Sequence, residues 1–249
     1  MLLRSITKHV KDQNWFAVVL DFCIVVLGIL IAFQITNWNE RRNDLVAEQK
    51  FLKRLIIDVD KAMTSSQRLR GRRIKQSEGM LQGLNVLLGK EDRKELTDDE
   101  CLYIAYSHDF TTTASSLPSF NEMLNSGRFE VIRNVALTEK LAAFQQSLEV
   151  LNYWLSWGTR DTHNLMDKFP ELIEMESFYD DQRSEVWSRA KCDSDGMTNN
   201  RQLLNNLAEN VDAMDGFLRD ALIPWSSQLK ALQQHLQTLT GHEIIRKMN

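Results

Sequence analysis

The histidines of this chain could bind a metal ion or transfer protons, but the five of them form no metal-binding pattern. The segment 242–246 reads HEIIR and lacks the second histidine that the zinc protease motif requires. His163 is close in sequence to Asp161 and Asp167, and we expect it to belong to a polar helix face. The histidines therefore predict no metal site and no catalytic site.

Acidic residues give no site either. The segment 193–196 (DSDG) is similar to part of a calcium-binding loop, but positions one and twelve of that loop would be Lys191 and Gln202, which are not carboxylates. No glycine-rich phosphate loop and no nucleophile elbow occurs in the sequence. We therefore expect a protein that is not an enzyme and that uses no metal and no cofactor.

A basic run, RLRGRRIK, is the strongest charge feature of the chain. Its five cations are Arg68, Arg70, Arg72, Arg73 and Lys75. They form a candidate anion patch that could bind anionic lipid, nucleic acid or an acidic partner. The net charge of −4 argues against nucleic acid. We expect a solvated helix face whose cations pair with acids on a neighbouring helix.

The three cysteines differ in their surroundings. Cys23 lies within an apolar segment, whereas Cys101 and Cys192 lie in the polar remainder of the chain. These two could form a disulfide if they are outside the cytoplasm. Two free, partly buried thiols are the alternative, and the sequence leaves both open.

The apolar segment between Trp15 and Trp38 predicts a membrane-spanning helix. It has close to the ~20 residues that a helix needs to cross the hydrocarbon layer, and its only polar groups before Thr36 are Asp21 and Gln34. A signal peptide would be shorter and end in a cleavage site, and a core helix would show a polar stripe. We predict three regions: a juxtamembrane amphipathic segment (1–14), a transmembrane anchor (15–38) and a helical domain (39–249).

The charges on either side of this segment bear on its orientation. The amino-terminal flank holds Arg4, Lys8 and Lys11 within the pattern of a short basic helix on an anionic inner leaflet. The other flank has more Lys and Arg in total, which favours the opposite orientation, but acids are interspersed among them. We expect the amino terminus to be inside.

A stripe of residues spaced three or four apart runs along the predicted anchor: Asp21, Val25, Gly28, Ala32 and Ile35. Gly28 and Ala32 are a small-xxx-small pair, which lets another helix approach closely. Asp21 either faces a partner or reaches the headgroups from its place near the end of the segment.

Three long amphipathic segments dominate the remainder, at about 39–88, 137–169 and 204–239. Their sustained seams are typical of helices packed at shallow angles. The fold class that we predict is all-α: an amino-terminal transmembrane helix followed by an elongated antiparallel helical bundle. No stretch alternates like a strand, so we expect no sheet.

Shorter signals punctuate these helices. We expect a break near Gly71 and a kink at Pro224. Capping boxes at 97–100 and 119–122 predict two short helices, the second ended by Gly127. Asn134 should cap the segment that begins at 137, Pro170 should end it, and 180–200 should be irregular.

Two stretches are similar to one family. GILIAFQITNWNE (28–40) and LPSFNEMLNSGRFEVIRN (117–134) resemble the anchor and central segments of an uncharacterised family of small bacterial single-pass membrane proteins, a domain of unknown function. Family members often carry Glu where this chain has Asp21. The resemblance implies a helical domain on the bacterial inner membrane, hence in the periplasm if the amino terminus is cytoplasmic. It implies no activity.

From these features we expect a membrane-anchored helical interaction protein of unknown specific role. Its partners would be membrane lipid and either another copy of the chain or an integral membrane partner, and no nucleic acid. The alternative is an extracytoplasmic module that senses a small molecule and acts through a partner.

Overall fold

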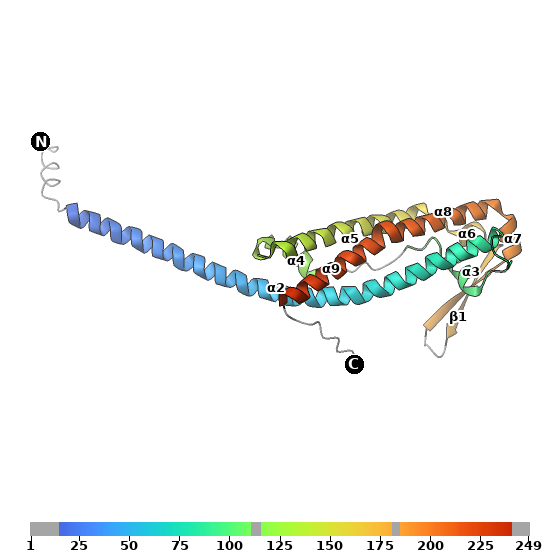
Figure 1. Cartoon of the computed structure of the whole chain (residues 1–249), viewed down its shortest axis with the longest axis horizontal. Helices are drawn as coiled ribbons and strands as arrows, with labels where there is room; N and C mark the ends of the chain where they lie inside the picture. The colour runs from blue at the N-terminus through green and yellow to red at the C-terminus, as the bar shows by residue number, and fades with distance from the viewer. Residues whose placement is uncertain (1–14, 111–115, 181–184, 241–249) are drawn as a thin grey trace, which may run out of the picture. The chain divides into compact units, whose positions relative to one another are not determined.

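The computed structural model describes residues 15–110, 116–180 and 185–240, and these are mostly helical (Figure 1). The chain divides into two compact units, Met1–Phe51 and Leu52–Asn249. One helix, α2 (Trp15–Leu87), belongs to both. The predicted break near Gly71 does not occur, because Gly71 is a single exposed glycine in an otherwise strong helix-forming run.

In the second unit, α2 turns an apolar side toward the core. Leu55, Val59, Met80, Leu84 and Leu87 on this side are almost completely buried. They are separated by three or four residues, or by nearly whole helical turns, and therefore lie on one face of the helix. This face is the base on which the remaining elements pack.

The short helix α3 (Asp98–Ala105) begins at the predicted capping box. The Thr97 hydroxyl accepts from the backbone N–H of Glu100, and the Glu100 carboxylate accepts from the backbone N–H of Thr97 at 2.9 Å. Two N–H groups without helical partners are thereby satisfied. The prediction for this helix is confirmed.

The second predicted capping box is wrong. Helix α4 (Pro118–Asn125) has Leu117 as its N-cap, without a side-chain cap. The backbone N–H of Ser119 instead donates to the Asp58 carboxylate of α2 at 2.8 Å, which places a negative charge at the start of α4. A group 61 residues away in sequence therefore replaces the local cap. Gly127 follows the helix with φ of +67°, as predicted.

A 3₁₀ turn, η1 (Phe129–Val131), leads into α5 (Val135–Asp161). As predicted, Asn134 caps this helix, because its side chain accepts from the N–H of Leu137 at 2.8 Å. The predicted end near Pro170 is wrong, since α5 stops at Asp161 and a separate turn, α6 (Leu165–Lys168), follows. The side chain of Asn210 accepts from the N–H and donates to the C=O of His163. These two hydrogen bonds hold the chain in a non-helical conformation between α5 and α6.

The carboxyl-terminal third is helical again, in α7 (Ser194–Asn199), α8 (Arg201–Phe217) and α9 (Ile223–Thr240). A π-helical turn, η2 (Leu218–Leu222), joins the last two just before Pro224. Proline cannot donate to the preceding turn, and wider turns accommodate such a missing hydrogen bond. The sequence predicted a kink at Pro224; the structure has a π turn at 218–222, and Pro224 itself lies at the start of α9.

The expectation of no sheet is wrong. Strands β1 (Ile173–Asp180) and β2 (Glu185–Cys192) pair antiparallel, with Phe178 opposite Trp187. They also replace part of the region predicted as irregular. Of residues 173–179 and 186–192, whose side chains the structure describes, only Ile173 and Ala190 at the base of the hairpin are buried, so most of each strand tolerates the charged residues that obscured the alternation.

Aromatic and aliphatic side chains fill the core of the second unit. Helices α5 and α9 lie side by side along it (Figure 1). The largest completely buried side chains are Trp225, Phe110, Phe120, Phe144 and Phe217. A further cluster joins the end of α2 to α3, α6, α7, α8 and the base of the hairpin through residues such as Leu87, Ile104, Leu165, Met197 and Leu207.

Candidate functional site

The part of α2 in the first unit is long and apolar enough to cross a membrane, and it is the one such helix in the described part of the chain. Its large apolar side chains from Val19 to Trp38 lie open rather than against the protein. Twelve of them are exposed: Val19, Leu20, Phe22, Ile24, Val25, Leu27, Ile29, Leu30, Ile31, Phe33, Ile35 and Trp38. A helix that is apolar on all sides needs an apolar environment around it.

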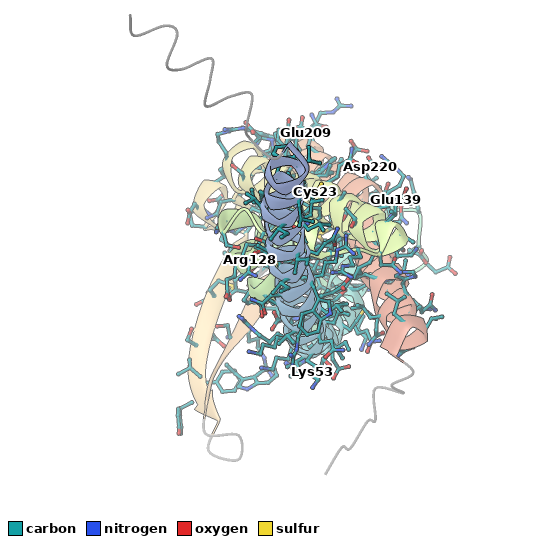
Figure 2. All side chains as sticks on the ribbon, turned by 90° about the vertical axis from the view of Figure 1, so that its left-hand side faces the viewer. Cys23, Lys53, Arg128, Glu139, Glu209 and Asp220 are labelled. Atoms are coloured by element: carbon teal, nitrogen blue, oxygen red, sulfur yellow. A yellow bond between two sulfur atoms is a disulfide. The ribbon has the colours of Figure 1, made fainter. Side chains whose placement is uncertain are left out.

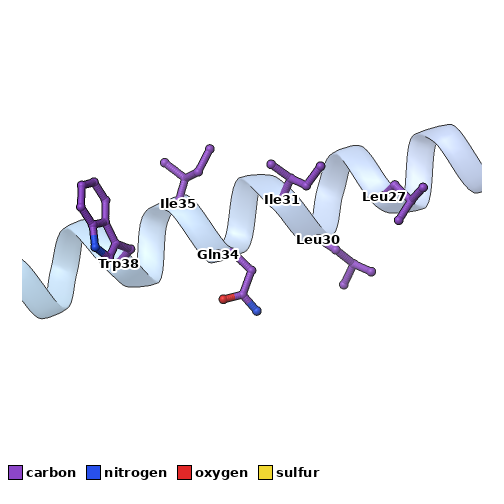
Figure 3. A pocket seen from close by; sticks show the side chains of 6 residues that line it. All are labelled: Leu27, Leu30, Ile31, Gln34, Ile35 and Trp38. Atoms are coloured by element: carbon purple, nitrogen blue, oxygen red, sulfur yellow. The ribbon is translucent and has the colours of Figure 1, made fainter.

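Two rows of side chains on this helix enclose a shallow groove, which we call the anchor groove (Figure 3). One row is Leu27, Ile31 and Ile35, and the other is Leu30, Gln34 and Trp38. Rows spaced four apart are the ridges that pack into grooves of a second helix. The groove has a volume of about 300 Å³, and its lining side chains carry two polar groups, the Gln34 amide and the Trp38 indole N–H.

The predicted stripe lies beside this groove and shares Ile35 with it. Val25, Gly28, Ala32 and Ile35 are all exposed, and a Cβ placed on Gly28 would meet nothing within 4 Å. Asp21 lies on the same helix, but its side chain is outside the described residues. The structure thus places the stripe on an open helix surface and shows no partner there.

Cys101 and Cys192 are joined in a disulfide, with their Cα atoms 5.8 Å apart. This bond links α3 to the end of β2, 91 residues further along the chain. It holds the base of the hairpin against the core, where Cys101 is buried. Cys23, on the apolar part of α2, is free and exposed.

The basic run divides into an inner and an outer part. Arg68, Arg70, Arg72 and Lys75 are exposed, and no ion pair joins them to an acid of residues 19–110, 116–179 or 186–239. We had expected these cations to pair with acids on a neighbouring helix, and within these residues they do not.

Arg73 is wrongly assigned to the anion patch, because its side chain is buried. Its guanidinium donates to the backbone carbonyl of Asp109 at 2.6 Å and to the Gln76 side chain at 2.7 Å. Gln76 in turn donates to the carbonyl of Tyr106 at 2.9 Å. Burial lowers the pKa of Arg73, and the charge of Asp109 opposes this. This network fixes the segment after α3 on α2.

Among the described residues no group of three His, Cys, Asp or Glu side chains could hold a metal ion. His163 accepts a hydrogen bond from Lys168 Nζ at Nδ1 (2.7 Å), so its proton is on Nε2 and points to Glu209 at 2.6 Å. His235 lies 3.4 Å from the Asn134 side chain. His242 is outside the described residues.

The structure also shows a surface groove that the sequence did not suggest, with a volume of about 430 Å³ between the end of α5 and α8. We call it the tryptophan groove. Its side chains with aromatic or charged groups are Trp154, Trp157, Asp161, Glu209, Asp212 and Arg219. The available signal was a pair of tryptophans three residues apart near a helix end, but Glu209 and Asp212 lie more than 50 residues further along the chain.

The two tryptophans meet edge to face, with ring centroids 5.3 Å apart. Gly216 of α8 allows Trp154 to lie against that helix, because a Cβ there would be 2.7 Å from the ring. The Glu209 side chain lies at the surface of the second unit (Figure 2). The groove thus combines half-buried aromatic rings with exposed carboxylates.

Compared with known proteins, the chain matches no family model, no curated protein and no solved structure. The resemblance to a family of small bacterial membrane proteins therefore stays a prediction.

Proposed function

We propose that this protein is anchored in the bacterial inner membrane by the apolar part of α2 and assembles there with another copy of itself or with an integral membrane partner. The observation that carries the proposal is the set of twelve exposed large apolar side chains between Val19 and Trp38. At roughly 1.5–3 kcal/mol for each large apolar side chain moved out of water, lipid favours this segment by on the order of 20 kcal/mol.

We further propose that the second unit lies in the periplasm as an antiparallel helical bundle, with the amino terminus in the cytoplasm. The Cys101–Cys192 disulfide supports this orientation, because such bonds persist in oxidising compartments. The packing of α5 along α9 supports the bundle. The basic amino-terminal flank is also consistent with an inside amino terminus.

The anchor offers two adjacent features for helix association. The anchor groove can accept the ridge of a second helix, and the Gln34 amide can hydrogen-bond across such an interface. Next to it, Gly28 presents open backbone that lets a second helix come close. A bulky side chain at Gly28 or Ala32 would hold that helix away.

The association is tested on the full chain in a non-ionic detergent by native mass spectrometry and by cross-linking in membranes. Gly28→Leu with Ala32→Leu should convert the assembly to monomer or release the co-purifying partner. Phe33→Trp, which enlarges an exposed residue on neither row of the groove and outside the stripe, is the control and should change nothing. A wild-type protein that is only monomeric and has no partner would refute the assembly part of the proposal.

Anchoring and orientation need separate measurements. Carbonate washing should leave the full chain in the membrane fraction, and a phosphatase fused after residue 249 should be active in the periplasm. A chain that carbonate extracts refutes the anchor. A fusion that is intact but inactive refutes the proposed orientation and does not contradict the membrane anchor.

A further inference from the structure

We propose that the tryptophan groove binds a small organic cation with an alkylated ammonium group. The inference goes beyond membrane anchoring and does not depend on it, because every residue that it uses lies in the second unit. The groove volume of about 430 Å³ is within the range of small-molecule sites.

The aromatic part of the groove fits such a ligand. An alkylated ammonium group is attracted to the electron-rich face of an indole and also makes apolar contacts with it. Trp154 and Trp157 are nearly perpendicular, at 75°, so their rings present surfaces in two directions. Two rings at this angle can contact a rounded cation on two sides.

The electrostatics of the groove also favour a cation. Glu209 and Asp212 come from α8, and Asp161 is the last residue of α5, where the helix dipole is negative. Asp212 is exposed and has no ion-pair partner among the residues of the second unit that the structure describes. Asp161 pairs with its neighbour Arg160, and an exposed pair of this kind contributes little.

Arg219, the guanidinium that lines the groove, does not make the electrostatic potential of the groove positive. Arg219 donates to Asp215 at 2.8 Å and to both oxygens of Asp220 at 3.0 Å. Two carboxylates thus offset its single charge, and its hydrogen bonds to Asp220 raise the pKa of Arg219. The His163 ring accepts from Lys168 Nζ at 2.7 Å and lies 2.6 Å from Glu209, so this chain of contacts orients the Glu209 carboxylate.

The floor of the groove is built in advance. Asn210 is completely buried, and its side chain binds Ser107 Oγ at 2.8 Å and the backbone of His163 on both its N–H and C=O. These bonds fix the end of α5 relative to α8. A preformed site loses less free energy on binding than one that must be ordered.

The test is calorimetric titration of the full chain, in a maltoside detergent, with choline and with tetramethylammonium. The neutral isostere of choline, 3,3-dimethylbutan-1-ol, has the same shape without the charge and should bind at least about tenfold more weakly. Saturable binding of the cations with this preference supports the proposal. Equal binding of the neutral alcohol, or no heat from either cation up to tens of millimolar, overturns it.

Variants locate the site. Trp157→Leu and Asp212→Asn should each weaken choline binding at least about tenfold, whereas Trp157→Phe, which keeps an aromatic face, should stay within a few-fold of wild type. Trp187→Leu on the hairpin and Glu139→Gln at the far end of α5 are the controls. Because Asp212 is exposed, its variant will fold even if Trp157→Leu does not. Choline binding that Asp212→Asn leaves unchanged would place the ligand elsewhere and refute the site.

Discussion

The ring of Phe110 lies directly against the backbone of Gly158 on α5. A Cβ placed on Gly158 would be 2.5 Å from Phe110 Cγ and within 2.9 Å of both neighbouring ring carbons. Phe110 is completely buried and packs edge to face on Phe217, with ring centroids 5.4 Å apart. The ring therefore has no room to move away from α5.

Gly158→Ala should destabilise the second unit by roughly 1–3 kcal/mol, because overpacking against a fixed ring outweighs the higher helix propensity of alanine. Gly71→Ala is the matched control. Nothing lies within 4 Å of its new methyl group, so we expect a gain of roughly 0.5–1 kcal/mol. Chemical denaturation followed by circular dichroism measures both. A Gly158→Ala protein as stable as Gly71→Ala would contradict the close contact.

Arg73 and Arg72 are adjacent in sequence but should respond differently to replacement by methionine. Arg73→Met leaves the Asp109 carbonyl and the Gln76 side chain without their donor in a buried place, which should cost roughly 2–3 kcal/mol. Arg72→Met removes an exposed charge and should change stability by less than about 0.5 kcal/mol. Urea unfolding of the two variants makes the comparison, and equal effects would show that Arg73 is not an internal residue.

The disulfide should account for a large share of the stability of the second unit. Cross-linking residues 91 apart restricts the unfolded chain by an amount that the loop-entropy relation puts at roughly 4–5 kcal/mol. Reduction, or replacement of Cys101 and Cys192 by alanine, should therefore lower Tm strongly. Cys23→Ala is the control, because Cys23 is free and lies outside this unit. Alkylation before and after reduction, read by mass spectrometry, should show two protected thiols.

Glu100 should make stability depend on pH in the acidic range. Burial alone would raise the pKa of this carboxyl, but hydrogen bonds from Arg93 and Thr97 outweigh burial, and the pKa lies below its usual 4.5. The folded protein therefore holds the proton less tightly than the unfolded chain. The stabilisation is complete above about pH 4.5 and is lost as pH falls below that value.

Glu100→Gln should be less stable than wild type at pH 7, by roughly 1–2 kcal/mol. The difference should shrink as pH falls below 4.5, which thermal unfolding between pH 7 and pH 3 would detect. Glu139→Gln, at an exposed position, is the control and should follow the wild-type curve. A Glu100→Gln deficit that stays constant down to pH 3 would contradict the lowered pKa.

Features that depend on a few neighbouring residues were predictable from the sequence. The capping box of Thr97 and Glu100, the left-handed Gly127 and the cap at Asn134 were predicted and are present. The apolar helix between Trp15 and Trp38 was predictable for the same reason. The caps depend on hydrogen bonds within one or two helical turns, and the apolar helix depends on the polarity of one continuous segment.

Only the tertiary structure decided the features made by residues far apart. Asp58 caps α4 in place of Ser119, and Asn210 ends α5 by binding His163, which no local pattern records. Arg73 lies inside because the segment at Asp109 folds over it, although its neighbours in the basic run face solvent. The tryptophan groove exists because α8 brings Asp212 beside Trp157. Such contacts form when distant chain segments pack together. Packing depends on how whole surfaces complement one another, and the residue order within one segment does not specify that complementarity.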